Sequence, residues 1–168
     1  MTIHVGTGGA WNWARPTLQW VAMRLLLING PNLNTLGTRE PHIYGTITLP
    51  EIERTVTERA AGLGAEVRAF QANAEGAIID WLQHEQSGAD GLIINAGSLT
   101  HYSIGLRDAV AGSGLRAIEV HISNVWKREE FRHHSLLSPV VDGAIVGLGA
   151  HGYVLAVEAL VSLIKGVE

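Results

Sequence analysis

A carboxylate and an imidazole that could exchange a proton stand two residues apart in the chain, at Glu119 and His121. They end an apolar run, and in a β-strand alternate side chains point to the same face, so these two would be neighbours. A carboxylate fixes the orientation of a neighbouring imidazole, and an oriented imidazole can act as a general acid or base. The alternative interpretation is a core histidine whose hydrogen bonds a glutamate satisfies.

Polar residues also follow the first apolar run of the sequence. Asn29-Gly30-Pro31-Asn32 comes directly after it, and a long connection containing Arg39 and Tyr44 continues to Thr46. Connections of this length inside a compact domain are uncommon unless they are functional or disordered. The first four residues could alternatively form only a turn, because asparagine and glycine tolerate left-handed backbone. For Tyr44 alone, a packing role is the alternative.

Two further polar segments follow later apolar runs. Asn95 to His101 comes after one of them, and Arg128 and Arg132 lie beyond His121. The two arginines would share a face if their segment were helical. They could alternatively do no more than pair with Glu129 or Glu130.

The elements that must position these residues alternate between strands and helices. Strands are predicted at Leu25–Ile28, Ala65–Phe70, Gly91–Ile94, Ala117–Val120 and Ala144–Val146, all short and mostly apolar as in parallel strands buried on both faces. Helices are predicted from Thr48-Leu49-Pro50-Glu51, through Ile78, Ile79 and Leu82, over Ile104 to Val110, and over Tyr153 to Ile164. This alternation predicts a doubly wound α/β domain with a parallel sheet of five strands. Such sheets carry their sites at the carboxyl ends of the strands, where the polar segments lie.

One motif resembles a dinucleotide fingerprint without its context. Gly147-Leu148-Gly149-Ala150-His151-Gly152 follows the last predicted strand rather than the first. A fingerprint needs a further strand with an acidic residue about 20 positions on, and the sequence ends at Glu168. Tight packing of a helix on the sheet is therefore the favoured interpretation of these glycines.

Composition narrows the function classes. The 168 residues carry a formal net charge of −4, with no cysteine and no basic run, which argues against nucleic-acid partners and excludes disulfides and thiolate metal sites. No apolar run approaches the roughly 20 residues that span a bilayer, so we expect no membrane partner and a cytoplasmic domain. Residues 1–22 lack any helical or strand period and are expected to be a flexible appendage, and residues 23–168 one catalytic domain.

Four segments, in order and spacing, make this chain similar to the type II dehydroquinases over about Arg24 to Ile164. They are Ile28–Asn34, Arg39–Gly45, Asn95–His101, and Glu119–Asn124 with Arg128–Arg132. The resemblance implies a flavodoxin-like fold and trimers that assemble into a dodecamer. It implies a lyase that converts 3-dehydroquinate to 3-dehydroshikimate by anti elimination through an enolate, in the shikimate or quinate pathway. It also implies that neither a metal nor a cofactor takes part.

The resemblance assigns the proton transfers to named residues. Tyr44 corresponds to the base, ionised with the help of the guanidinium of Arg39, on a Thr38–Thr46 loop expected to close as a lid. His121 corresponds to the general acid and Glu119 to the residue that orients it. Asn32 is expected to hold a water against the enolate oxygen.

The resemblance assigns the remaining site residues to substrate binding. The carboxylate would be held by Asn95 with the backbone amides of Ile122 and Ser123, the ring hydroxyls by His101 and Arg132. Arg128 would be a second positive charge near the base, and Asp108 would reach a neighbouring site across a trimer interface. Two residues depart from the family pattern, Ser98 and Tyr102, and could narrow the site or alter an interface.

Two rival interpretations come from other classes of protein. One is a non-catalytic flavodoxin-like module that binds a phosphate or nucleotide, which the missing P-loop lysine argues against. The other is an oligomeric scaffold with an inert site, which the presence of Arg39, Tyr44 and His121 together disfavours.

Overall fold

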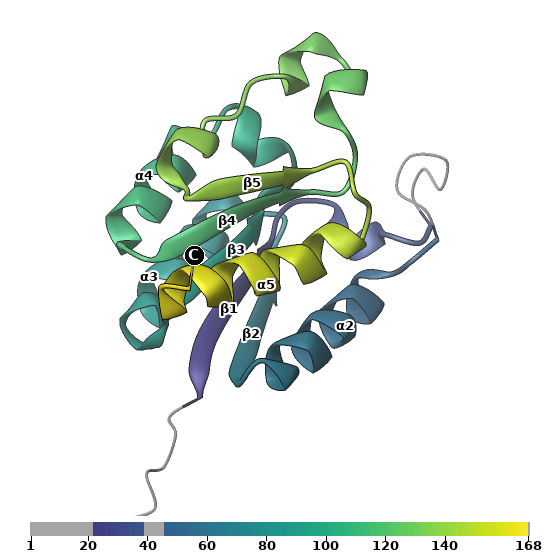
Figure 1. Cartoon of the computed structure of the whole chain (residues 1–168). Helices are drawn as coiled ribbons and strands as arrows, with labels where there is room; N and C mark the ends of the chain where they lie inside the picture. Colours follow the sequence, from purple (N-terminus) through teal and green to yellow (C-terminus); the bar gives the residue numbers. More distant parts are fainter. Residues whose placement is uncertain (1–21, 39–45, 168) are drawn as a thin grey trace, which may run out of the picture.

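The computed structural model describes residues 22–38 and 46–167 of the chain (Figure 1). The predicted base Tyr44 and its predicted activator Arg39 lie outside the described residues, as does nearly all of the expected appendage. The sheet, its covering helices and the pocket all lie within these two ranges.

A single sheet of five parallel strands forms the centre of the domain, as the sequence predicted. The strands are β1 (Met23–Asn29), β2 (Ala65–Gln71), β3 (Gly91–Asn95), β4 (Arg116–His121) and β5 (Gly143–Val146). Their order is β2-β1-β3-β4-β5, the flavodoxin-like order, in which ligands bind at the point between β1 and β3 where the strand order reverses. The pairing of these two strands ends at Asn29 opposite Asn95, so two asparagines stand side by side at that point.

Four helices cover the two faces of the sheet, and each predicted helix is present. They are α2 (Leu49–Gly62), α3 (Glu75–Glu85), α4 (Ile104–Ser113) and α5 (His151–Lys165). Helices α2 and α5 pack on the face that receives Leu25 and Leu27, and α3 and α4 pack on the face that receives Leu26 and Ile28 (Figure 1). Because alternate residues of β1 enter opposite cores, the run Leu25–Ile28 serves both layers at once.

The helix starts follow from local chemistry. Thr48 and Glu51 form the predicted capping box, with the Thr48 backbone N–H donating to Glu51 Oε2 at 2.8 Å. Ser103 caps α4 by accepting a hydrogen bond from the Leu106 N–H at 2.9 Å. These caps fix where the polar loops before α2 and α4 end.

The expectation that all five strands are buried on both faces is wrong for the two outer ones. Strands β1, β3 and β4 are almost entirely buried, but β2 exposes Glu66, Arg68 and Ala69, and β5 exposes Ala144. Each outer strand has a hydrogen-bonded neighbour on one side only, and the four helices cover chiefly the centre of the sheet. Within the described ranges, no helix is both long and apolar enough to cross a membrane.

Candidate active site

A pocket lies at the carboxyl ends of β1, β3 and β4 and encloses about 680 Å³, including its open mouth. Its lining comes from the loops after these three strands: Pro31, Asn32, Leu33 and Leu36; Asn95, Gly97, Ser98 and His101; His121, Ile122, Ser123, Val125, Arg128 and Arg132. Eight residues that the sequence singled out therefore meet in one place: Asn32, Asn95, His101, His121, Ile122, Ser123, Arg128 and Arg132.

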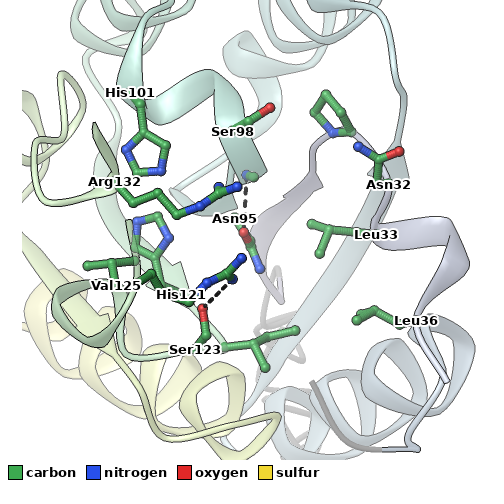
Figure 2. Close-up of a pocket in the computed structure, with 14 residues that line it drawn as sticks. Asn32, Leu33, Leu36, Asn95, Ser98, His101, His121, Ser123, Val125 and Arg132 are labelled. Atoms are coloured by element: carbon green, nitrogen blue, oxygen red, sulfur yellow. Dashed lines mark hydrogen bonds between the residues drawn. The ribbon is translucent and has the colours of Figure 1, made fainter. Parts of the chain in front are cut away.

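Basic side chains gather on one side of the pocket, and two leucines lie on the other. In Figure 2, His101, His121 and Arg132 lie on one side, and Leu33 and Leu36 lie on the other together with Asn32. Leu33 and Leu36 carry no signal in the sequence beyond that of ordinary turn residues after Asn32. Their side chains supply the apolar contact that a carbon ring would need.

Glu119 and His121 are hydrogen-bonded neighbours on one face of β4, as predicted. His121 Nε2 lies 2.8 Å from Glu119 Oε1; Glu119 is fully buried and His121 is 8% exposed. Because an ionised carboxylate only accepts hydrogen bonds, Nε2 carries a proton and Nδ1 is the nitrogen left for another partner. His121 also lines the pocket, so the pair is more than a satisfied core histidine.

Three hydroxyls surround the Glu119 carboxylate from the other side. Thr100 and Ser138 donate to it, the latter at 2.7 Å, and Ser135 Oγ lies 3.0 Å from both oxygens. Burial alone would raise the pKa of Glu119, but hydrogen bonds from His121, Ser138 and Thr100 outweigh it and lower that pKa to about 2. The carboxylate is thus a fixed negative charge behind His121. Sequence reasoning missed all three hydroxyls, since serine and threonine are too common to single out.

His101 lies beside His121, with ring centroids 6.4 Å apart and planes 18° from parallel. Its Nδ1 is 2.8 Å from the His134 carbonyl oxygen, which can only accept, so Nδ1 carries the proton. Burial, followed by the positive charges of His121 and Arg132, lowers the pKa of His101. A neutral ring presents Nε2 as an acceptor, which suits a substrate hydroxyl.

Arg128 and Arg132 both reach the pocket and both pair with Glu129. Arg128 Nε and Arg132 Nε lie 3.4 Å and 2.9 Å from Glu129 Oε2. Their segment is not a helix but two short 3-10 turns, Val125–Lys127 and Glu130–Arg132, so the helical-face argument does not apply. Both arginines thus pair with Glu129 and also line the pocket, and Arg128 Nη1 lies 3.4 Å from Ser123 Oγ.

The first loop is both a tight turn and a wall of the pocket. Asn32 adopts left-handed backbone with a φ of 67°, and its N–H donates to Asn73 Oδ1 at 2.9 Å. A Cβ on Gly30 would lie 2.3 Å from the Ala96 carbonyl oxygen. Only glycine therefore allows the loop after β1 to contact the loop after β3. This segment is therefore a turn, as the first interpretation predicted, and its Pro31 and Asn32 also line the pocket.

Asn95 lies at the floor of the pocket with its amide held from two sides. Its Nδ2 donates to the Tyr153 hydroxyl at 2.7 Å, and its Oδ1 accepts from the Gly97 N–H at 3.2 Å. One amide hydrogen remains for a ligand. Tyr153, on α5, carried no signal in the sequence beyond that of an apolar helix position.

Asp108 is not brought to this pocket. It lies exposed on α4, where Arg107 Nη1 donates to its Oδ1 at 2.7 Å, and it borders a separate shallow hollow between α3 and α4. Of the two departures from the family pattern, Ser98 lines the pocket and Tyr102 is 62% exposed.

The glycines after β5 serve packing, as predicted. The N–H groups of Gly147 and Gly149 donate to the carbonyl oxygens of His121 and Ile122, both at 3.0 Å. A Cβ on Gly152 would meet Ile145 at 3.3 Å, which places α5 close against the sheet. This turn therefore holds the backbone that carries His121. In the described part of the chain, no group of three or more metal-binding side chains is present.

Fold and pocket together define a flavodoxin-like α/β protein with a hydrogen-bonded carboxylate–imidazole pair at the carboxyl edge of its sheet. The sequence pattern of the family described as Dehydroquinase class II matches residues 23–161. This chain belongs to that family.

Individual relatives give the same picture. The chain is 53% identical over 144 residues to a 3-dehydroquinate dehydratase of Anoxybacillus flavithermus, covering 86% of this chain and 97% of the relative. It is 55% identical over 134 residues to the catabolic 3-dehydroquinase 1 of Aspergillus fumigatus, covering 80% and 89%. A crystal structure of type II dehydroquinase from Butyrivibrio crossotus superposes with a TM-score of 0.80 at 49% identity, covering 82% and 97%.

Proposed function

We propose that this chain removes water from 3-dehydroquinate to give 3-dehydroshikimate. The observation that carries the proposal is the hydrogen-bonded pair of Glu119 and His121 opening onto a pocket in a chain of this family. A tertiary hydroxyl is a poor leaving group, so the reaction needs a positioned acid of this kind.

The first half of the reaction is the removal of a proton beside the ketone. We assign the base to Tyr44 and its activation to Arg39, on the strength of the sequence resemblance. A phenol with a pKa near 10 must lose its proton to serve, and a guanidinium favours the anion. The resulting enolate oxygen would be stabilised by a water held by Asn32, which lines the pocket.

The second half is the departure of the β-hydroxyl as water. His121 donates a proton to that hydroxyl while the enolate electrons form the new carbon–carbon double bond. Glu119 keeps the ring oriented and compensates its positive charge, and the hydroxyls around Glu119 keep this carboxylate ionised. The products are water and a conjugated enone.

Substrate binding is assigned to the remaining polar residues of the pocket. Asn95, with the backbone amides of Ile122 and Ser123, would hold the carboxylate, with Arg128 nearby. His101 and Arg132 would hold ring hydroxyls, and the neutral state of His101 favours the acceptor role.

We also propose that the enzyme works as trimers assembled into a dodecamer, with Asp108 completing the site of a neighbouring copy. Asp108 is exposed on α4 and lies outside its own chain's pocket. Tyr102 and Ile104, just before it, are 62% and 66% exposed, an apolar surface suited to a second copy. Sedimentation analysis and KM measurements on the wild type and on Asp108→Asn test this. The variant should keep the assembly by sedimentation and lose substrate affinity, seen as a raised KM.

The direct test mixes purified protein with 3-dehydroquinate and follows the ultraviolet absorbance of the conjugated enone. Wild type should generate the product, and His121→Asn should generate it at least about a hundredfold more slowly. A wild type without dehydratase activity that instead binds flavin or a nucleotide would overturn the proposal in favour of a binding module.

A further inference from the structure

A chain of hydrogen bonds runs beneath the pocket and ends at Asn95. Asn29 Nδ2 donates to Glu53 Oε1 of α2 at 3.2 Å, and the Tyr153 hydroxyl donates to Asn29 Oδ1 at 2.9 Å. Asn95 Nδ2 then donates to the Tyr153 oxygen at 2.7 Å, and Asn95 Oδ1 accepts from the Gly97 N–H at 3.2 Å. Asn29 and Tyr153 are fully buried, and Asn95 is 3% exposed.

The donor and acceptor roles of these groups give this series of hydrogen bonds one direction. A carboxylate only accepts hydrogen bonds, so Glu53 must face the NH2 group of Asn29. The oxygen of Asn29 then faces Tyr153, and the phenol donates its single proton there. Tyr153 is left with only lone pairs for Asn95, so it must meet the amide nitrogen of Asn95 and not the amide oxygen.

This direction decides which end of the Asn95 amide faces a ligand. The two hydrogens of an amide nitrogen diverge, so with one bound to Tyr153 the other is available to the pocket that Asn95 lines. Rotating the amide by half a turn would replace that donor by an oxygen. The oxygen would repel a carboxylate, whereas the nitrogen binds it.

We propose that Tyr153 is a positioning residue, which with Asn29 and Glu53 locks the Asn95 amide in the orientation that binds the substrate's carboxylate. The inference rests on the proposed function, in which Asn95 belongs to the carboxylate pocket. Packing alone does not require the phenol oxygen, since phenylalanine would fill the same buried space. The buried hydroxyl lies between two asparagines that stand opposite each other in the register of β1 and β3.

The test compares wild type with Tyr153→Phe, Glu53→Gln and a control, Val157→Ala. Val157 is fully buried one turn further along α5, so its truncation weakens the same helix without touching the hydrogen-bond chain. Losing one well-aligned hydrogen bond to a charged group corresponds to about a tenfold change or more in affinity. We expect Tyr153→Phe to raise KM about tenfold with kcat within about twofold, and Val157→Ala to leave both unchanged.

A second readout separates positioning from general loss of structure. The affinities of the product and of its neutral carboxamide analogue are measured by calorimetry. Wild type should prefer the carboxylate, and Tyr153→Phe should lose most of that preference, because a carboxamide can pair with either end of Asn95. Glu53→Gln should lose part of the preference for the carboxylate, since glutamine can donate as well as accept. Because Glu53 is partly exposed, this variant also provides the test if Tyr153→Phe does not fold.

The outcomes distinguish the two proposals. A wild type with no dehydratase activity refutes the proposed function. A wild type that is active, together with variants whose KM and carboxylate preference match those of Val157→Ala, refutes the positioning role alone.

Discussion

Replacing Glu119 by glutamine should remove a measurable part of the acid sensitivity of the fold. The pKa of Glu119 lies at about 2 in the folded chain, against 4.5 for an ordinary glutamate, because the hydrogen bonds of His121, Ser138 and Thr100 overcome the effect of burial. A difference of this size corresponds to about 3 kcal/mol, at about 1.36 kcal/mol for each pKa unit. The folded pKa is the lower one, so this stability is complete above about pH 4.5 and is lost as the pH falls towards 2.

The assay is urea unfolding between pH 7 and pH 2 at one protein concentration, since assembly would make stability depend on concentration. The unfolding free energy of wild type should fall by about 3 kcal/mol more than that of Glu119→Gln over this range. Other carboxylates contribute to both curves equally, so the difference reports Glu119 together with its pairing to His121.

Two serine variants sharpen the comparison. Ser138→Ala removes the hydroxyl at 2.7 Å from Glu119 Oε2, so the pKa of Glu119 should rise and the acid loss should begin at higher pH. Ser162→Ala removes a hydroxyl that contacts only the Val167 carbonyl among the described residues, and should behave as wild type does. Parallel curves for wild type and Glu119→Gln would refute the account of Glu119 as a strongly held anion.

Four other perturbations have definite expected results. His121→Asn should fold normally by circular dichroism and lose turnover at least a hundredfold, the usual scale for a general acid, because the leaving hydroxyl is no longer protonated. Tyr44→Phe should abolish exchange of the substrate's α-proton, followed by NMR, while the product still binds. Arg39→Ala should shift the rise of activity with increasing pH to higher pH in a pH–rate profile. Arg39→Lys should recover only part of the loss, because a point charge does not reproduce the guanidinium fork. Deletion of residues 1–22 should leave melting temperature and turnover within error of wild type, because that segment has no periodic apolar face; a large drop in melting temperature would show that its tryptophans pack.

The fold could be predicted because its elements are encoded locally. The run Leu25–Ile28 predicted a buried strand, and the capping box at Thr48 predicted where α2 begins; both are confirmed. Helix α5 begins at His151 rather than Tyr153, since Gly152 interrupts the apolar pattern that marks the rest of the helix. The prediction of burial was wrong for the outer strands β2 and β5, because burial depends on which elements cover a strand and not on the strand's own sequence.

The site could be predicted only in part, for a related reason. Glu119 and His121 are two residues apart, so strand geometry alone predicts their contact. The hydroxyl of Ser138 reaches Glu119 from 19 positions away, and that of Tyr153 reaches Asn29 from 124 positions away. No local pattern encodes such contacts, because they depend on how loops and helices pack over the sheet.

The close contact between Gly30 and the backbone of Ala96 has a consequence for altering substrate range. Beside the pocket, the loops after β1 and β3 pack main chain against main chain, and a Cβ on Gly30 would lie 2.3 Å from a carbonyl oxygen. A mutant library directed at Gly30 would therefore yield misfolded protein before it yielded a new pocket shape. Leu33, Leu36 and Ser98 line the same cavity through their side chains, and redesign for ring systems of other sizes belongs at those three positions.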